Sequence, residues 1–114
     1  MSLCHHKQTT IPPTALMTGY EMKTTFWTDF NIADRFGKTA IEDTYQRAFN
    51  EWKDDKIYAT ELCMVLNWKS WEHSDNCLAD EIGRLYVELY YKFRNYILDH
   101  WKGEKLTYFL ETTD

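Results

Sequence analysis

The sequence contains few of the residues that build disulfide frameworks or phosphate-binding turns. Four glycines and two prolines occur in 114 residues, and neither a GxGxxG nor a GxxxxGK motif is present. The three cysteines, Cys4, Cys63 and Cys77, are odd in number and widely spaced, with no CxxC pair. A secreted disulfide scaffold and a nucleotide-binding phosphate loop are therefore both disfavoured.

Long apolar segments and an excess of basic charge are also missing. The longest uninterrupted apolar run, residues 62–66, is far shorter than the ~20 residues that cross a bilayer. Residues 1–22 lack the apolar core of a signal peptide. Thirteen basic residues face eighteen acidic ones, for a formal net charge of −5. These features predict a cytoplasmic protein with no membrane contact and no nucleic-acid partner.

Aromatic residues, by contrast, are abundant and make up 17 % of the chain. A chain of this length forms one domain and buries about two-thirds of the surface that its unfolded form exposes. The sequence predicts a single helical domain at residues 23–114. It is preceded at residues 1–22 by an irregular leader, in which Pro12 and Pro13 block a helix. This leader is either part of the native protein or an addition to its natural start.

Apolar residues recur at spacings of three and four along most of the chain, which indicates helices. We expect a short helix that Thr28 or Asp29 caps and Gly37 ends, then helices over residues 38–53, 57–73 and 77–102. A last turn is expected within residues 104–110. The predicted fold class is all-α, a small helical bundle of about four main helices with a long fourth helix and a short C-terminal turn.

The helices predicted over residues 57–73 and 77–102 each carry two apolar stripes, whereas a surface helix usually carries one. The second stripes contain Met64, Trp68, Trp71, Val87, Tyr91 and Leu98. Either both faces of each helix are buried within the domain, or one face receives a partner. Because tryptophan and tyrosine are frequent anchors at interfaces, we expect at least one of these stripes to form an interaction surface.

The sequence offers no catalytic or metal-binding motif. Cys4 and the two histidines that follow it are adjacent ligand types in the leader, which makes a poor preformed site. His73 and His100 belong to no HExxH or CxxC pattern, and no GxSxG elbow occurs. We therefore expect no enzyme, no cofactor and no metal site made by the protein. An enzyme remains an alternative if His73, His100 or Cys63 meets carboxylates in space.

Three segments carry a resemblance to a known group of proteins. Residues 23–37, 43–53 and 61–69 read KTTFWTDFNIADRFG, DTYQRAFNEWK and ELCMVLNWK. Together they resemble small uncharacterised helical proteins that phages and integrative elements of anaerobic bacteria carry, and the likeness extends over about residues 22–114. The resemblance implies a mobile-element context. That group has no assigned activity, so no functional residue is carried over.

These observations favour a non-enzymatic protein–protein interaction module. Its partner would be a second copy, giving a homodimer, or a protein of the host or of the element. One alternative is an acidic decoy that occupies the groove of a nucleic-acid-binding protein, which would need a contiguous acidic face. The other alternative is the enzyme whose site forms only in three dimensions.

Overall fold

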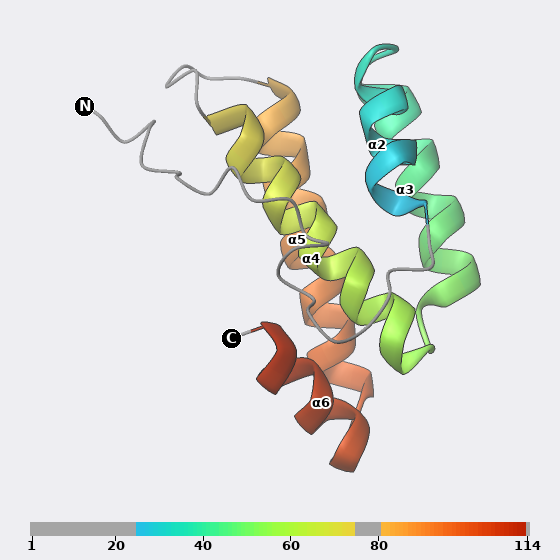
Figure 1. Cartoon of the computed structure of the whole chain (residues 1–114), viewed down its shortest axis with the longest axis vertical. Coiled ribbons are helices and arrows are strands. Elements are labelled where there is room, and N and C mark those ends of the chain that lie inside the picture. Colours follow the sequence, from blue (N-terminus) through green and yellow to red (C-terminus); the bar gives the residue numbers. More distant parts are fainter. Residues whose placement is uncertain (1–24, 75–80, 114) are drawn as a thin grey trace.

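The computed structural model describes residues 25–74 and 81–113, and these residues form an all-α fold (Figure 1). The helices are α2 (Phe26–Asp34), α3 (Lys38–Trp52), α4 (Lys56–Ser74), α5 (Glu81–His100) and α6 (Gly103–Thr113). The predicted all-α class is thus confirmed. The expectations for residues 1–22, Cys77 and the side chain of His73 lie outside the described residues.

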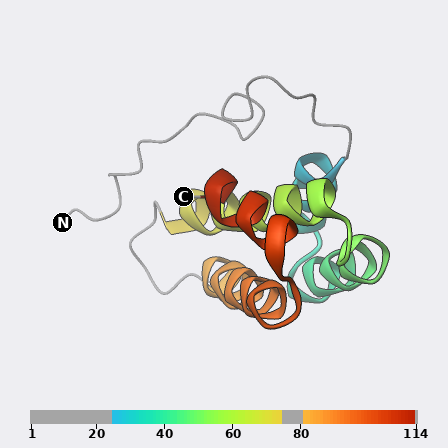
Figure 2. The same cartoon turned by 90° about the horizontal axis from the view of Figure 1, so that it is seen from below.

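The helices form two layers with α4 at the centre. Figure 2 shows α2, α4 and α6 in one layer, and α3 and α5 in the other. α4 packs against each of the other four described helices, and its most extensive contact is with α5. In Figure 1, α2 and α3 stand on one side of the α4–α5 pair, and α6 lies against its lower end. Among the described helices, none is long and apolar enough to cross a bilayer.

Local side-chain chemistry sets the boundaries between α2, α3 and α4. Gly37 joins α2 to α3 with a φ of +106°, a conformation that glycine adopts without a steric penalty. Asp55 caps α4, because its Oδ1 accepts the backbone N–H groups of Ile57 at 3.0 Å and Tyr58 at 2.9 Å. The breaks predicted at these two places are therefore present.

α2 begins earlier than either of its expected caps. Its first residue is Phe26, and Thr25 occupies the N-cap position. Asp29 lies in the first turn, where a carboxylate interacts favourably with the helix dipole. Its Oδ2 accepts a hydrogen bond of 2.8 Å from the Thr25 hydroxyl. The carboxylate therefore supports the first turn from inside the helix instead of capping it.

The C-terminal segment forms an eleven-residue helix, α6, instead of the short turn expected. Its Phe109 is fully buried, and the Phe109 ring meets that of Trp101 edge-on at 6.0 Å. Phe109 lies in the second turn of α6, so burying it holds the segment in helical form. α5 has twenty described residues and ends at His100, two residues before the predicted end.

The central position of α4 accounts for its nearly continuous apolar sequence. The side chains of Leu62, Cys63, Val65 and Leu66 are fully buried, although they point in different directions around the helix axis. A helix that is apolar on all sides is stable only where neighbours surround it. Of the second stripe of α4, Trp68 is buried, Met64 is half-buried and Trp71 remains exposed.

α5, in contrast, turns one face to the core. Its Phe93 is fully buried and contacts two rings of α3 edge-on, at 6.2 Å from Tyr45 and 5.8 Å from Phe49. Such edge-to-face aromatic pairs are favourable beyond the area they bury. With Phe93 and Ile97 directed inward, helical geometry directs residues 87, 91 and 98 outward.

Candidate functional site

An exposed apolar row runs along the outer face of α5. Val87, Tyr91 and Leu98 are 41 %, 55 % and 40 % exposed, respectively. Their spacing of four and seven residues places them on one side of the helix. Arg94 lies between them in sequence, and its guanidinium sits over the Phe109 ring of α6, 5.7 Å from the ring centroid. We call Val87, Tyr91 and Leu98 the outer row.

A hollow of about 300 Å³ lies beside the outer row, between α4, α5 and the end of α6. Its lining consists of Cys63, Met64, Asn67, Trp68, Trp71, Tyr90, Thr112 and Thr113. The exposed ring of Trp71 packs against that of Trp68 at 5.3 Å. The ring of Tyr90 contacts that of Tyr91, edge-on at 4.9 Å. Tyr90 therefore connects the hollow to the outer row. We call Trp71, Tyr90 and the outer row together the α4–α5 surface.

The six residues of the predicted second stripes take up different positions. Four are exposed: Trp71, Val87, Tyr91 and Leu98. Met64 is half-buried in the wall of the hollow. Trp68 is only 7 % exposed, and its ring packs against the more exposed ring of Trp71. The structure thus brings together Met64, Trp68 and Trp71 at the hollow, and adds Tyr90 to them.

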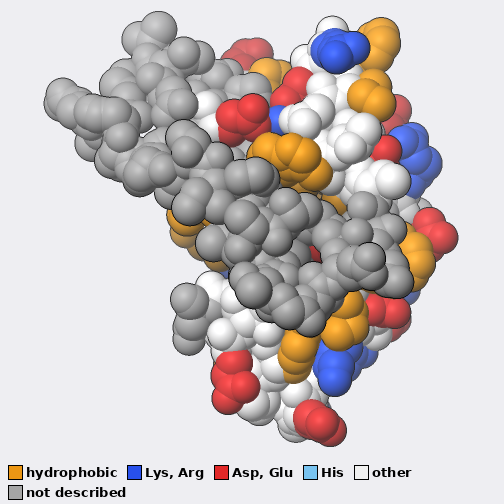
Figure 3. Space-filling model, viewed as in Figure 1, with side chains coloured by type: hydrophobic (Ala, Val, Ile, Leu, Met, Phe, Trp, Pro, Cys, Tyr) orange, Lys and Arg blue, Asp and Glu red, His pale blue; other side chains and the backbone are white. Residues whose placement is uncertain are grey.

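Charged residues follow the outer row along the same exposed side of α5. In chain order they are Glu81, Arg84, Glu88, Lys92 and Asp99, all exposed. Their signs alternate from Glu81 to Asp99, so this flank has no single charge. On the part of the molecule visible in Figure 3, acidic side chains are scattered, with basic ones between several of them. An acidic decoy would need these carboxylates gathered on one face.

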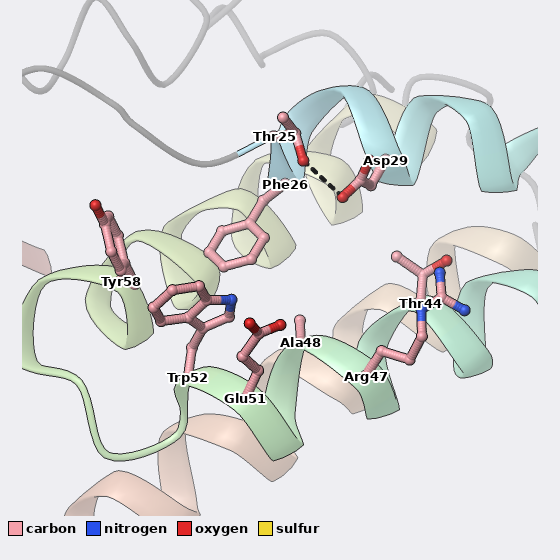
Figure 4. A pocket seen from close by; sticks show the side chains of 9 residues that line it. All are labelled: Thr25, Phe26, Asp29, Thr44, Arg47, Ala48, Glu51, Trp52 and Tyr58. Atoms are coloured by element: carbon pink, nitrogen blue, oxygen red, sulfur yellow. Dashed lines mark hydrogen bonds between the residues drawn. The ribbon is translucent and has the colours of Figure 1, made fainter.

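A second hollow, of about 380 Å³, lies between α2, α3 and the start of α4 (Figure 4). Trp52 and Tyr58 form one of its walls, with their rings edge-on at 4.6 Å. Figure 4 shows the Glu51 carboxylate pointing into the hollow, while Arg47 lies along α3 towards Thr44. Because the described lining sets two carboxylates, Glu51 and Asp29, around one guanidinium, its charges do not converge on one ligand chemistry.

A third polar feature is the fully buried ammonium group of Lys69 on α4. Its Nζ lies 2.6 Å from Asn31 Oδ1, 2.7 Å from Asp34 Oδ2 and 2.7 Å from Glu72 Oε1. An ammonium group has three protons to donate, so these three oxygens satisfy it. Asp34 also accepts a hydrogen bond from the hydroxyl of Tyr86 on α5. The cluster therefore ties α2, α4 and α5 together.

The contacts of the Lys69 cluster indicate a structural role. The Lys69 ammonium is fully buried, and three oxygens of α2 and α4 occupy its three donor positions, so none is left for a ligand. Burial, with the nearby Asp34 carboxylate, raises the pKa of Tyr86 far above its usual value. This cluster was not predicted from the sequence. A lysine in a helix that is apolar on all sides was the available signal, but nothing in the sequence pairs Lys69 with Asp34.

The described groups that the enzyme alternative invoked do not form a reactive pair. Burial raises the pKa of the Cys63 thiol to about 12, which keeps it protonated at neutral pH, and only the thiolate is a strong nucleophile. The ring of His100 is exposed and stacks on Tyr96 at 4.2 Å. Within residues 25–74 and 81–113, no three or more His, Cys, Asp or Glu side chains are placed to hold a metal ion.

A smaller apolar patch lies at the end of α2. It consists of Ile32 and Phe36, 47 % and 77 % exposed, beside a shallow hollow of about 310 Å³. Asp29, Asp43 and Arg47 also line this hollow. With two apolar side chains among charged ones, it is less extensive and less aromatic than the α4–α5 surface.

Comparison of the chain with protein-family models, with curated proteins and with solved structures gives no match. We therefore infer the function from the geometry of the chain itself.

Proposed function

We propose that the chain is a non-enzymatic protein–protein interaction module that docks through the α4–α5 surface. The observation that carries this proposal is the outer row of α5, which continues through Tyr90 into a hollow lined by tryptophan. Contiguous exposed apolar surface on a small domain is typical of a docking site.

The α4–α5 surface has the chemistry of an interface centre. Trp71 and Tyr91 are large, rigid and partly polar, and these two residue types dominate binding energy at interfaces. Both rings are already held by a neighbouring ring, at 5.3 Å from Trp68 and 4.9 Å from Tyr90. Binding therefore costs little side-chain entropy, because the anchors are ordered before the partner arrives.

The hollow and the charged flank have separate roles in this proposal. A hollow of about 300 Å³ is large enough for one or two apolar side chains of a partner. The alternating charges along α5 form a polar rim, which selects the partner and its orientation more than it adds affinity. In the mobile-element context that the sequence resemblance implies, the partner is a second copy or a protein of the host or element.

Site-specific photo-crosslinking tests the proposal in the cells that produce the chain. A photoreactive phenylalanine analogue at position 87 is compared with the same analogue at Gln46, an exposed residue of α3. We expect a covalent protein adduct from position 87 and none from position 46. The Tyr91→Glu substitution should remove most of the adduct, because it places a charge at the centre of the buried contact.

Mass spectrometry of the adduct then identifies the partner as this chain or another protein. An equal yield from both positions, or no adduct from position 87, would contradict the proposal. The loss of the adduct in the Tyr91→Glu variant is informative only if the variant keeps the helical circular dichroism spectrum of the original chain. Since Tyr91 is 55 % exposed, we expect this substitution to leave the fold intact.

A further inference from the structure

The hollow between α4, α5 and the end of α6 has the lining of a small-ligand site. On α4, the rings of Trp68 and Trp71 form a corner, with their centroids 5.3 Å apart and their planes inclined at 59°. Tyr90 lines the hollow from α5, and Cys63 and Met64 add two further apolar side chains. Ligand pockets are concave, mostly apolar and about 300–1,000 Å³ in volume. At about 300 Å³, this hollow suits a molecule of about one or two rings.

Two polar side chains of the lining are available to a ligand. Within the described part of the chain, neither the Asn67 amide nor the Thr112 hydroxyl has a hydrogen-bond partner. Thr113, in contrast, donates its hydroxyl proton to the backbone carbonyl of Phe109 at 2.8 Å. An amide group and a hydroxyl group can each donate and accept hydrogen bonds. The hollow can therefore bind one polar group of a ligand without breaking an existing hydrogen bond.

The charge of the lining disfavours most ions. None of the described residues around the hollow has a charged side chain, so an ion would lose hydration there without gaining a counter-ion. An anion would also meet the negative faces of the aromatic rings. Only a cation gains an attraction, because aromatic faces favour positive charge. A quaternary ammonium ion is therefore the main rival to a neutral ligand.

Arg94 makes a cation unfavourable in the hollow. It lies one turn after Tyr90 on α5, with its guanidinium 5.7 Å from the centroid of the Phe109 ring. Burial raises the pKa of both Tyr90 and Cys63, and the positive charge of Arg94 opposes this rise at both groups. The potential of Arg94 therefore reaches two residues that line the hollow. A neutral molecule is insensitive to this potential, whereas a cation is repelled by it.

We infer that the hollow between α4, α5 and α6 binds a small, neutral, planar aromatic molecule that carries one hydrogen-bonding group. The rings of Trp71 and Tyr90 hold its aromatic part, and Asn67 or Thr112 binds its polar group. This inference goes beyond the proposed function, because it depends on the hollow and not on the outer row. A bound ligand and an apolar side chain of a protein partner would compete for the same space.

Indole is a suitable probe, because it is neutral and planar and has one N–H donor. Methyl NMR of the purified chain, labelled with ¹³C at the methionine methyl groups, places a reporter in the wall of the hollow at Met64. The Met64→Leu variant assigns its signal. We expect a saturable shift of this signal, with a dissociation constant between about 0.1 and 10 mM for so small a probe. Tetramethylammonium should leave the Met64 signal unchanged over the same range.

Three variants locate the site and test the role of charge. Trp71→Ala removes a ring that is 41 % exposed, and it should weaken indole binding at least about tenfold. Trp52→Ala is the matched control, because Trp52 lines the second hollow, and it should change the affinity less than about twofold. Arg94→Gln should leave indole binding within about threefold and allow tetramethylammonium to shift the Met64 signal. Circular dichroism checks that each variant keeps its helices.

The absence of a saturable Met64 shift with indole up to about 10 mM overturns this inference. Equal weakening by Trp71→Ala and Trp52→Ala also overturns it, because the binding would then not depend on the hollow. Binding of tetramethylammonium to the original chain as tightly as indole overturns the neutral class of ligand. The purified chain contains no partner protein, so none of these results alters the photo-crosslinking at position 87. A failure of this inference is therefore distinguishable from a failure of the proposed function.

Discussion

α4 and α5 carry similar apolar patterns but lie in different environments. Both have two apolar stripes. α4 is packed against the four other described helices, so its first stripe is largely buried and Trp71 is the one exposed member of its second stripe. α5 packs on α3 and α4, and its outer row remains exposed. The comparison shows that a second stripe does not by itself identify an interface. A second stripe is a candidate interface only where none of the described helices covers that side.

The polar residues of the two helices differ in the same way. Lys69 of α4 is fully buried and held by three oxygens within 2.7 Å. The charged residues of α5, such as Arg84 and Asp99, are exposed. A charge on α4 therefore stabilises the fold of the chain, whereas a charge on α5 is available to a partner. Substitutions on the two helices should separate stability from association.

The largest loss of stability is expected from Lys69→Met. Removing one partner of a buried ion pair costs about 3–5 kcal/mol, and here it leaves the Asp34 carboxylate, only 19 % exposed, without the cation of Lys69. Lys53→Met is the matched control. Its ammonium lies 3.5 Å from Asp54 Oδ2 and is 36 % exposed, so its loss should cost less than about 1 kcal/mol. Urea unfolding at a concentration where the chain is monomeric measures both. Equal losses would contradict the structural role of Lys69.

A pair of apolar truncations compares the two helices directly. Leu66→Ala on α4 should cost about 2–5 kcal/mol, because it leaves a cavity in a fully buried position. Val87→Ala on α5 should change the free energy of unfolding of the monomer by less than about 0.5 kcal/mol. Binding to the partner, in contrast, should weaken for Val87→Ala. If Val87→Ala destabilised the monomer as much as Leu66→Ala, the outer row would belong to the core.

Alkaline pH should destabilise the chain through groups buried around α4. Burial raises the pKa of Cys63 from 9.0 to about 12 and that of Tyr45 from 10.0 to about 12. Both groups are neutral when protonated, so the folded state holds their protons more tightly than the unfolded state does. Stability is therefore complete below about pH 9 and is lost as the pH rises towards 12.

The expected slope is about 1.4 kcal/mol per pH unit for each group in the range where only the unfolded chain ionises. Urea unfolding at a series of pH values from 8 to 11 measures it. Tyr45→Phe should flatten the curve above pH 10, where the unfolded tyrosine begins to ionise. An unchanged slope in this variant would show that Tyr45 ionises equally in both states.

Much of the helical organisation could be predicted from the sequence, because it depends on local periodicity and capping. The predicted helix over residues 38–53 matches α3 to within one residue, and that over 57–73 matches α4 equally well. The segment that forms α6 was expected to be only a turn. Its helical form is stabilised by packing Phe109 against Trp101. That contact involves tertiary packing, which spacing along one segment does not reveal.

The candidate site was predictable only in part, for the same reason. Periodicity placed Val87, Tyr91 and Leu98 on one face, and this face is exposed. It could not separate Trp68, which is 7 % exposed, from Trp71, which is 41 % exposed, because they lie three residues apart on the same side of α4. The difference between their exposed fractions depends on tertiary packing, which spacing along α4 does not reveal.

Solvent labelling in the presence of the partner tests the central claim most directly, namely that the outer row of α5 is buried by association. Carbene footprinting of the chain in a lysate of the cells that produce it is compared with footprinting of the dilute purified chain. In each sample, labelling of Val87, Tyr91 and Leu98 is divided by that of Phe36, which is 77 % exposed on the other side of the fold. The account predicts that this ratio is severalfold lower in the lysate than in the dilute purified chain. An equal ratio in the two samples, or protection of Phe36 instead, would contradict it.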